Sequence, residues 1–250
     1  MLIRFILISQ ILFFNIFVIR TQAILRDAVT NGILNSNQAL RTIGTTKFEI
    51  GNHSQDLSIN NINYDDINGS PFWENKYQKA SLYFDSKFIT KADVRLNILT
   101  DEIHYINDSL ELVVDSGIVN KIVFEYSNDT VVFMKEINNL FLNSKQLKNF
   151  VQILNFGKFQ LIKFQIKKLK TSELFSPNGR FTYYFLTDVV YFIRRNEIVD
   201  NIKKLNKESL YHCLPSSNNY TNWAIKNKIN FKNEKDVVKF LNYYNSKIVE

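Results

Sequence analysis

The chain has 250 residues, a formal net charge of +7 and 45% hydrophobic residues, enough to build the core of one or two domains. Cys213 is its one cysteine, so an intramolecular disulfide is excluded and stability must come from packing. The sequence contains no internal repeat at a solenoid period, no nucleophile elbow, no phosphate-binding loop and no zinc signature. A disulfide-stapled scaffold and a repeat protein are therefore excluded.

A secretory signal peptide is predicted over residues 1–23. Arg4 precedes an apolar run over residues 5–19, and small residues, ending in Ala23, stand before the expected cleavage site. The run is shorter than the about 20 apolar residues that a membrane-spanning helix needs. We expect export across the inner membrane and a mature chain that begins at Ile24, periplasmic or associated with the cell surface. The alternative is an uncleaved anchor, and no cysteine near the cut could carry a lipid.

Residues 24–68 are predicted to form a polar lead-in that is exposed or poorly ordered, because they show no lasting hydrophobic period. The spacing of Asn and Asp over residues 61–65 resembles a calcium loop. However, Asp66 and Phe72 stand where such a loop needs a Gly and a bidentate Glu. We therefore expect no metal and no other cofactor.

The stretch GSPFW, residues 69–73, marks the entry of the chain into its fold. A turn signal at Gly69 is followed by two large aromatic side chains, Phe72 and Trp73. The favoured interpretation is that this aromatic pair covers the open end of a core. The alternative is an exposed anchor, in which Phe72, Trp73 and Tyr77 form a partner-binding site.

Residues 69–197 are predicted to form an antiparallel β-rich domain, since the hydrophobic period changes to two from residue 92 onward. Polar turns separate strand-length runs that leave no room for helical crossovers. The runs are EIHYI, SLELVV, KIVFEY, VVFM, GKFQLIKFQIKK, FTYYFL and DVVYFIRR. The fold class expected is α+β, with about eight or nine strands by pattern in a meander, a sandwich or an open barrel.

Residues 198–250 are predicted to form a small C-terminal helical subdomain, packed on the sheet or free. Ile198, Ile202 and Leu205 recur at helical spacing. The clearest helix covers residues 233–247, with Asn233 as N-cap and acidic residues in its first turn. Its expected apolar face comprises Val237, Phe240, Leu241 and Tyr244.

These features together resemble a group of uncharacterised secreted proteins from Bacteroidota bacteria. The resemblance rests on the signal peptide, the polar lead-in, GSPFW, ADVRLNILTDEIHYI and the terminal KNKINFKNEKDVVKFLNYYNS. It covers most of residues 69–250 and implies a bacterial source and export. It implies no catalytic residue.

Residues that could carry chemistry do not form a recognised motif. None of the three histidines stands at a metal-ligand spacing: His53, His104 and His212. His212 and Cys213 are neighbours that face different ways on a helix, so Cys213 is expected to be a small buried hydrophobe. Asp101 and Glu102 could flank a cleft, but turn chemistry explains them equally well. No catalytic, cofactor-binding or metal-binding residue is assigned, and the balance favours a protein that is not an enzyme.

The leading functional hypothesis is a non-catalytic secreted protein that binds a partner, another envelope or secreted protein, or serves a structural role. An enzyme of unknown class acting on an envelope polymer is the alternative. A weaker alternative is nucleic-acid binding through the basic C-terminal half, by Lys163, Lys167, Lys168 and Lys170. Solvated strand faces explain these lysines more simply, and the identity of the partner and the oligomeric state stay open.

Overall fold

A computed structural model describes residues 44–46, 67–107, 110–114, 118–135, 137–171, 182–215 and 218–248. The signal peptide and most of the lead-in lie outside the described residues. The strands are β1 Gly44–Thr46, β2 Ile67–Asn68, β3 Gln78–Phe84, β4 Lys87–Asn97, β5 Glu102–Asn107, β6 Leu110–Val114, β7 Lys121–Glu125, β8 Thr130–Met134, β9 Phe141–Leu142, β10 Lys145–Gln146, β11 Val151–Ile153, β12 Phe159–Thr171, β13 Tyr183–Arg195 and β14 Ile198–Ile202. The helices follow at the C-terminal end: α3 Lys207–Cys213, α4 Asn218–Lys226 and α5 Glu234–Lys247.

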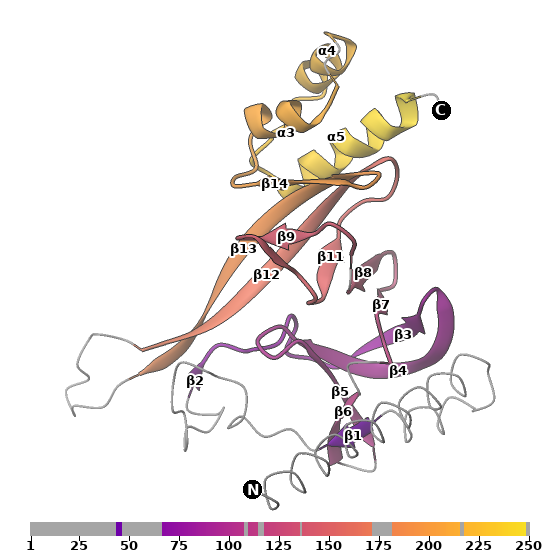
Figure 1. The fold of residues 1–250 in the computed structure, drawn as a ribbon, viewed down its shortest axis with the longest axis vertical. Coiled ribbons are helices and arrows are strands. Elements are labelled where there is room, and N and C mark those ends of the chain that lie inside the picture. Colours follow the sequence, from indigo (N-terminus) through magenta and orange to yellow (C-terminus); the bar gives the residue numbers. More distant parts are fainter. Residues whose placement is uncertain are drawn as a thin grey trace, which may run out of the picture.

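Nearly all the described strands join one open sheet (Figure 1). Its strand order is β1-β6-β5-β4-β3-β7-β8-β11-β12-β13-β14, and β9 and β10 form a separate hairpin. These neighbours pair antiparallel, whereas β2 adds in parallel to the far end of β13. The predicted α+β class with a mainly antiparallel sheet is confirmed, and the sheet is open.

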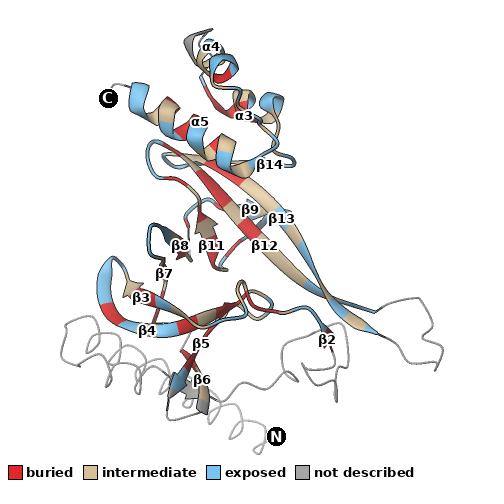
Figure 2. Cartoon of the chain, turned by 180° about the vertical axis from the view of Figure 1, so that it is seen from behind, coloured by how far each residue is buried: buried red, intermediate tan, exposed pale blue. Residues whose placement is uncertain are grey.

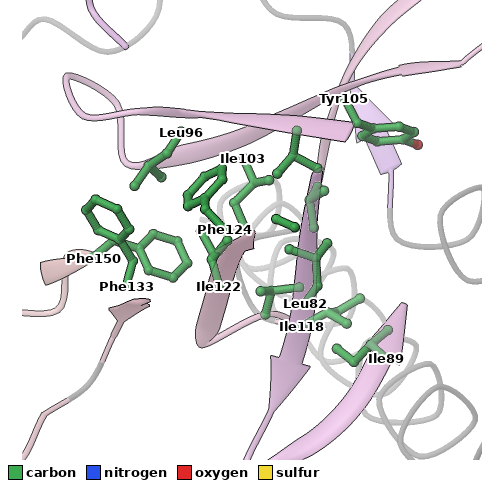
Figure 3. Packing of buried hydrophobic residues seen from close by; sticks show 14 residues of the cluster. Leu82, Ile89, Leu96, Ile103, Tyr105, Ile118, Ile122, Phe124, Phe133 and Phe150 are labelled. Atoms are coloured by element: carbon green, nitrogen blue, oxygen red, sulfur yellow. The ribbon is translucent and has the colours of Figure 1, made fainter. Parts of the chain in front are cut away.

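The β3–β7 core lies on one face of the first half of the sheet (Figure 3). Alternate positions of its strands point inward, so that Leu82, Val94 and Ile122 are 0% exposed. The buried members of this core are Ala80, Leu82, Ile89, Val94, Leu96, Ile103, Tyr105, Val114, Ile118, Val119, Ile122, Phe124, Phe133 and Phe150. This is the burial that the period-two pattern predicted.

The helix core lies where α3, α4 and α5 pack on β12, β13 and β14. Asn233 caps α5 by accepting a hydrogen bond from the backbone N of Asp236 at 3.2 Å. The predicted apolar face of α5 is buried against Phe159, Leu161 and Ile193 of the sheet: Val237, Phe240, Leu241 and Tyr244. The terminal helix is therefore packed on the sheet. The opposite face of β12 and β13 contributes to a third cluster, with Ile162, Phe164 and Phe192.

Three boundaries differ from the sequence-based expectations. Ile198–Ile202 is a strand, not the start of a helix, and pairs antiparallel with β13. A spacing of four residues puts side chains on one face of a strand as well as of a helix, so the pattern was compatible with both. The two runs predicted between residues 181 and 195 are one continuous strand, β13. Finally, β1 and β2 show that parts of the predicted lead-in belong to the sheet.

A long two-stranded ribbon extends from the sheet. β12 and β13 pair without interruption from Phe159↔Arg195 to Thr171↔Tyr183. At the helix end the ribbon is flanked on both edges, but β11 pairing stops at Lys163 and β14 pairing stops at Tyr191. At the far end only β2 is paired, with Tyr183 and Tyr184 of β13. Beyond β11 and β14 the ribbon runs away from the helices and its residues become half-buried or exposed (Figures 1 and 2). Residues 165–171 and 183–190 are called the arm below.

Candidate functional site

The GSPFW segment continues the sheet along β4. Phe72 bridges Asn97, the backbone N of Trp73 donates to the carbonyl of Leu96 at 2.9 Å, and Ile98 N donates to the carbonyl of Pro71 at 3.0 Å. β3 pairs with β4 only as far as Val94, and the GSPFW segment pairs with the same edge of β4 beyond that residue. Because neighbouring side chains of an extended chain point to opposite faces, Phe72 and Trp73 enter different environments.

Trp73 enters the β3–β7 core. Its ring is half-buried and lies 5.1 Å from the ring of Phe124 and 5.0 Å from that of Phe133. Both separations are typical of favourable aromatic pairs. This placement is the one expected if the aromatic pair covers the open end of a core.

Phe72 packs on the other face of the sheet, where it is 6% exposed. The guanidinium carbon of Arg95 lies 3.7 Å from the centre of its ring, and the ring of His104 meets it edge-on at 5.1 Å. Tyr77 lies on the same guanidinium, at 4.8 Å. The three residues predicted as a partner-binding site are therefore divided, with Trp73 on one face and Phe72 and Tyr77 on the other, and their role in binding stays a prediction.

Arg95 belongs to a polar cluster with His104 and Glu111. The carboxylate of Glu111 accepts from Arg95 Nη2 at 2.6 Å and lies 2.6 Å from His104 Nδ1. Burial alone would raise the pKa of Glu111, but the hydrogen bonds from Arg95 and His104 outweigh it and hold the pKa below its usual value. Burial, with a hydrogen bond to Glu111, raises the pKa of Tyr77 to about 12. The cluster therefore holds an ionised carboxylate beside its cation at neutral pH.

Sequence reasoning missed this cluster because its members come from three strands. Arg95 and His104 are cross-strand partners on β4 and β5, and Glu111 lies on β6 diagonally opposite His104. The only signal in the sequence is that all three alternate with the residues of their strands that face the β3–β7 core. Finding them together requires the register between the strands, which short-range patterns do not specify.

Asp101, proposed as a residue that could flank a cleft, joins the β4–β5 turn to β8 and to the start of β11. Its carboxylate accepts from the backbone N of Phe150 at 2.7 Å and pairs with Lys135 Nζ at 2.7 Å. Burial raises its pKa against the opposing effect of Lys135. Glu102 accepts from Thr100 Oγ1 at 2.6 Å. These contacts account for both carboxylates within the fold.

The side chains of His212 and Cys213, neighbours at the end of α3, lie in different environments. His212 is exposed, whereas Cys213 is 6% exposed and its Sγ donates to the carbonyl of Ser209 at 3.3 Å. Burial raises the pKa of the Cys213 thiol. Its predicted role as a small buried hydrophobe is confirmed. His53 lies outside the described residues, and within those residues no group of three His, Cys, Asp or Glu side chains could hold a metal ion.

The arm carries the large apolar side chains that the cores leave exposed along β13. Tyr184 is 38%, Leu186 41% and Val189 39% exposed. Tyr184 and Leu186 share a face with Lys170 and Lys168, their cross-strand partners. Val189 lies on the opposite face of the ribbon. The arm is therefore amphipathic on both faces, and it is the candidate functional site of this protein.

The four lysines of the nucleic-acid hypothesis are divided between the two faces of β12. Lys163 and Lys167 point to one face, and Lys168 and Lys170 to the other. Lys163 Nζ pairs with Glu234 at 2.9 Å and Lys168 Nζ with Asp188 at 2.6 Å. Such a division does not favour one lysine-lined groove.

Comparisons with protein-family models, with curated proteins and with solved structures gave no match. The resemblance to secreted Bacteroidota proteins therefore stays a prediction. In the part of the chain that the structure describes, no helix has the length and apolar character to cross a membrane.

Proposed function

We propose that the protein is a secreted, non-catalytic binding protein of the periplasm or cell surface, and that the arm holds another envelope or secreted protein. The observation that supports this most directly is the exposure of Tyr184, Leu186 and Val189 on a ribbon that extends beyond the cores. Exposed apolar side chains that gather on one element are typical of protein interaction sites. A two-stranded ribbon is marginally stable alone in water, so a partner that covers the arm would stabilise it.

The charge of the arm indicates the chemistry of the partner. Lys167, Lys168 and Lys170 lie among its apolar side chains, and Asp188 is the one acidic residue in the described part of the arm. Burial lowers the pKa of Lys167, so its ammonium is incompletely solvated. A surface with apolar groups and carboxylates would complement this arm, whereas a second copy of the arm would bring like charges together. We therefore infer an acidic protein partner in preference to self-association.

Site-specific photo-crosslinking tests the proposal. A photoreactive residue at Tyr184 should capture one partner in intact cells, and the same residue at Phe141, which is 49% exposed in β9, should not. Leu186→Asp and Lys170→Glu should each abolish the capture, because they place negative charge against an acidic surface. Lys145→Glu, at an exposed position of β10, is the matched control and should leave it unchanged.

Three outcomes would overturn the arm proposal. These are equal capture from both positions, capture that survives Leu186→Asp, and a crosslinked species that is a second copy of this chain. A nuclease-sensitive species would instead support the nucleic-acid alternative. Turnover of an isolated envelope polymer by the purified protein would support the enzyme alternative.

Export is tested separately by sequencing the N-terminus of the protein from fractionated cells. A mature chain that begins at Ile24 in the periplasmic or surface fraction is expected. Soluble cytoplasmic protein that still begins with Met1 would end the argument for secretion.

A further inference from the structure

A hollow of about 350 Å³ lies at the opposite end of the β12–β13 ribbon from the arm. It is formed by the β11–β12 turn, the β13–β14 turn and the segment after β8. Met134 and Ile137 supply apolar groups to its wall, and Lys158, Gln160, Arg194 and Glu197 supply polar ones. Its volume is at the lower end of the range for small-molecule sites, roughly 300–1,000 Å³.

The hollow contains cationic groups that the fold does not neutralise. Among the described residues no carboxylate forms an ion pair with Arg194 or Lys158, whereas the charge of Lys135 is matched by Asp101. Glu197 is the one acidic residue of the wall. Arg194 and Lys158 therefore give the hollow a net positive charge, which favours an anionic ligand.

The side chain of Arg194 and the backbone of the turn that carries Lys158 are held by the surrounding structure. Arg194 and Gln160 are cross-strand partners, and Arg194 Nη2 donates to Gln160 Oε1 at 2.5 Å. This bond uses part of the guanidinium fork and leaves further N–H donors for a ligand. Lys158 lies in the β11–β12 turn, which Asn245 of α5 ties down through Nδ2, 3.3 Å from the carbonyl of Phe156. A site whose polar groups are positioned beforehand binds with a smaller entropy cost.

We infer that this hollow is a binding site for a small polar molecule carrying one anionic group, a carboxylate or a phosphate, of the size of a sugar acid or a sugar phosphate. Arg194 binds the anionic group through its planar donors, and Lys158 adds a second positive charge. Gln160, Asn138 and Asn196 supply amide groups that hydrogen-bond to hydroxyls of the ligand. The inference is independent of the arm and does not rest on the proposed partner.

Calorimetric titration of the full mature chain tests this site. The probes are glucuronate, glucose 6-phosphate and inorganic phosphate, with glucose as the neutral control. At least one of the three anions should bind, glucose should not, and comparison of the anions identifies carboxylate or phosphate as the preferred group. Arg194→Gln should weaken binding by about tenfold or more, because it removes a charge-assisted pair of hydrogen bonds.

The variants Glu197→Gln and Lys145→Gln make the test specific. Glu197→Gln removes the one carboxylate of the wall and should tighten anion binding several-fold. Lys145→Gln lowers the net charge by the same amount as Arg194→Gln, at an exposed position outside the wall of the hollow, and should have no effect. The inference is overturned if no anion binds at roughly 10 mM or below. It is also overturned if Arg194→Gln and Lys145→Gln weaken binding equally while thermal melts show both variants folded, since binding would then follow net charge alone.

Discussion

Trp73→Ala gives the sharpest test of how the chain enters its fold. The substitution removes an indole ring that lies within about 5 Å of two core rings, those of Phe124 and Phe133. Deleting a buried Phe or Trp side chain costs about 3–5 kcal/mol, and an aromatic pair contributes about 0.5–1.5 kcal/mol beyond area burial. Because Trp73 is only half-buried, we expect the lower end of that range, a loss of about 3 kcal/mol in the free energy of unfolding.

Urea denaturation followed by intrinsic fluorescence and circular dichroism measures this loss. With a urea slope of about 2 kcal/mol per molar, the midpoint should fall by about 1.5 M. Phe156→Ala is the control, because that ring is 58% exposed and its loss should change stability by less than about 0.5 kcal/mol. An unchanged midpoint for Trp73→Ala would refute the core-closing interpretation. If that stable variant also lost its crosslinked partner, the site formed by Phe72, Trp73 and Tyr77 would replace the arm.

Three further changes test other parts of the structure by the same denaturation assay. Phe240→Asp should destabilise the protein by about 4 kcal/mol or more, because it puts a charge at a 0% exposed position, whereas Lys239→Asp one residue earlier should be tolerated. An equal effect of the two would mean that α5 does not pack as described. Glu111→Gln should cost about 1–3 kcal/mol at neutral pH. The pKa of Glu111 is held below its ordinary value in the folded state, so its contribution is fully present above the unfolded pKa, and the difference from the unmodified protein should shrink as pH falls through the folded pKa. A difference that stays constant with pH would contradict this. Gly157→Ala should destabilise the β11–β12 turn, because φ is +129° there and an added Cβ would lie 2.6 Å from Asn245 Nδ2; wild-type stability would show that the turn can relax.

Local patterns in the sequence predicted the elements whose signature lies within a few consecutive residues. The buried stripe with Phe240 follows from a period of 3.6 residues, and the cap at Asn233 follows from the preference of Asn for the N-cap position; both are observed in α5. The period of two predicted the strands of the β3–β7 core for the same reason, since each strand buries alternate side chains. The sequence left two interpretations of Trp73 open, a cover of the core or an exposed anchor. A short stretch of sequence does not show which distant residues pack against it.

The tertiary structure decided every feature that depends on how distant segments align. Residues 198–202 could form a helix or a strand by their spacing, and pairing with β13 selected the strand. Arg95, His104 and Glu111 meet because β4, β5 and β6 adopt one register, and a shift by one residue would turn their side chains to the other face. The sequence by itself determined the β-rich fold class and the capped terminal helix, since hydrophobic period and capping act over a few residues. Only the folded sheet decided where the polar cluster, the exposed arm and the cationic hollow lie, because strand register and turn geometry are set by packing across the whole chain.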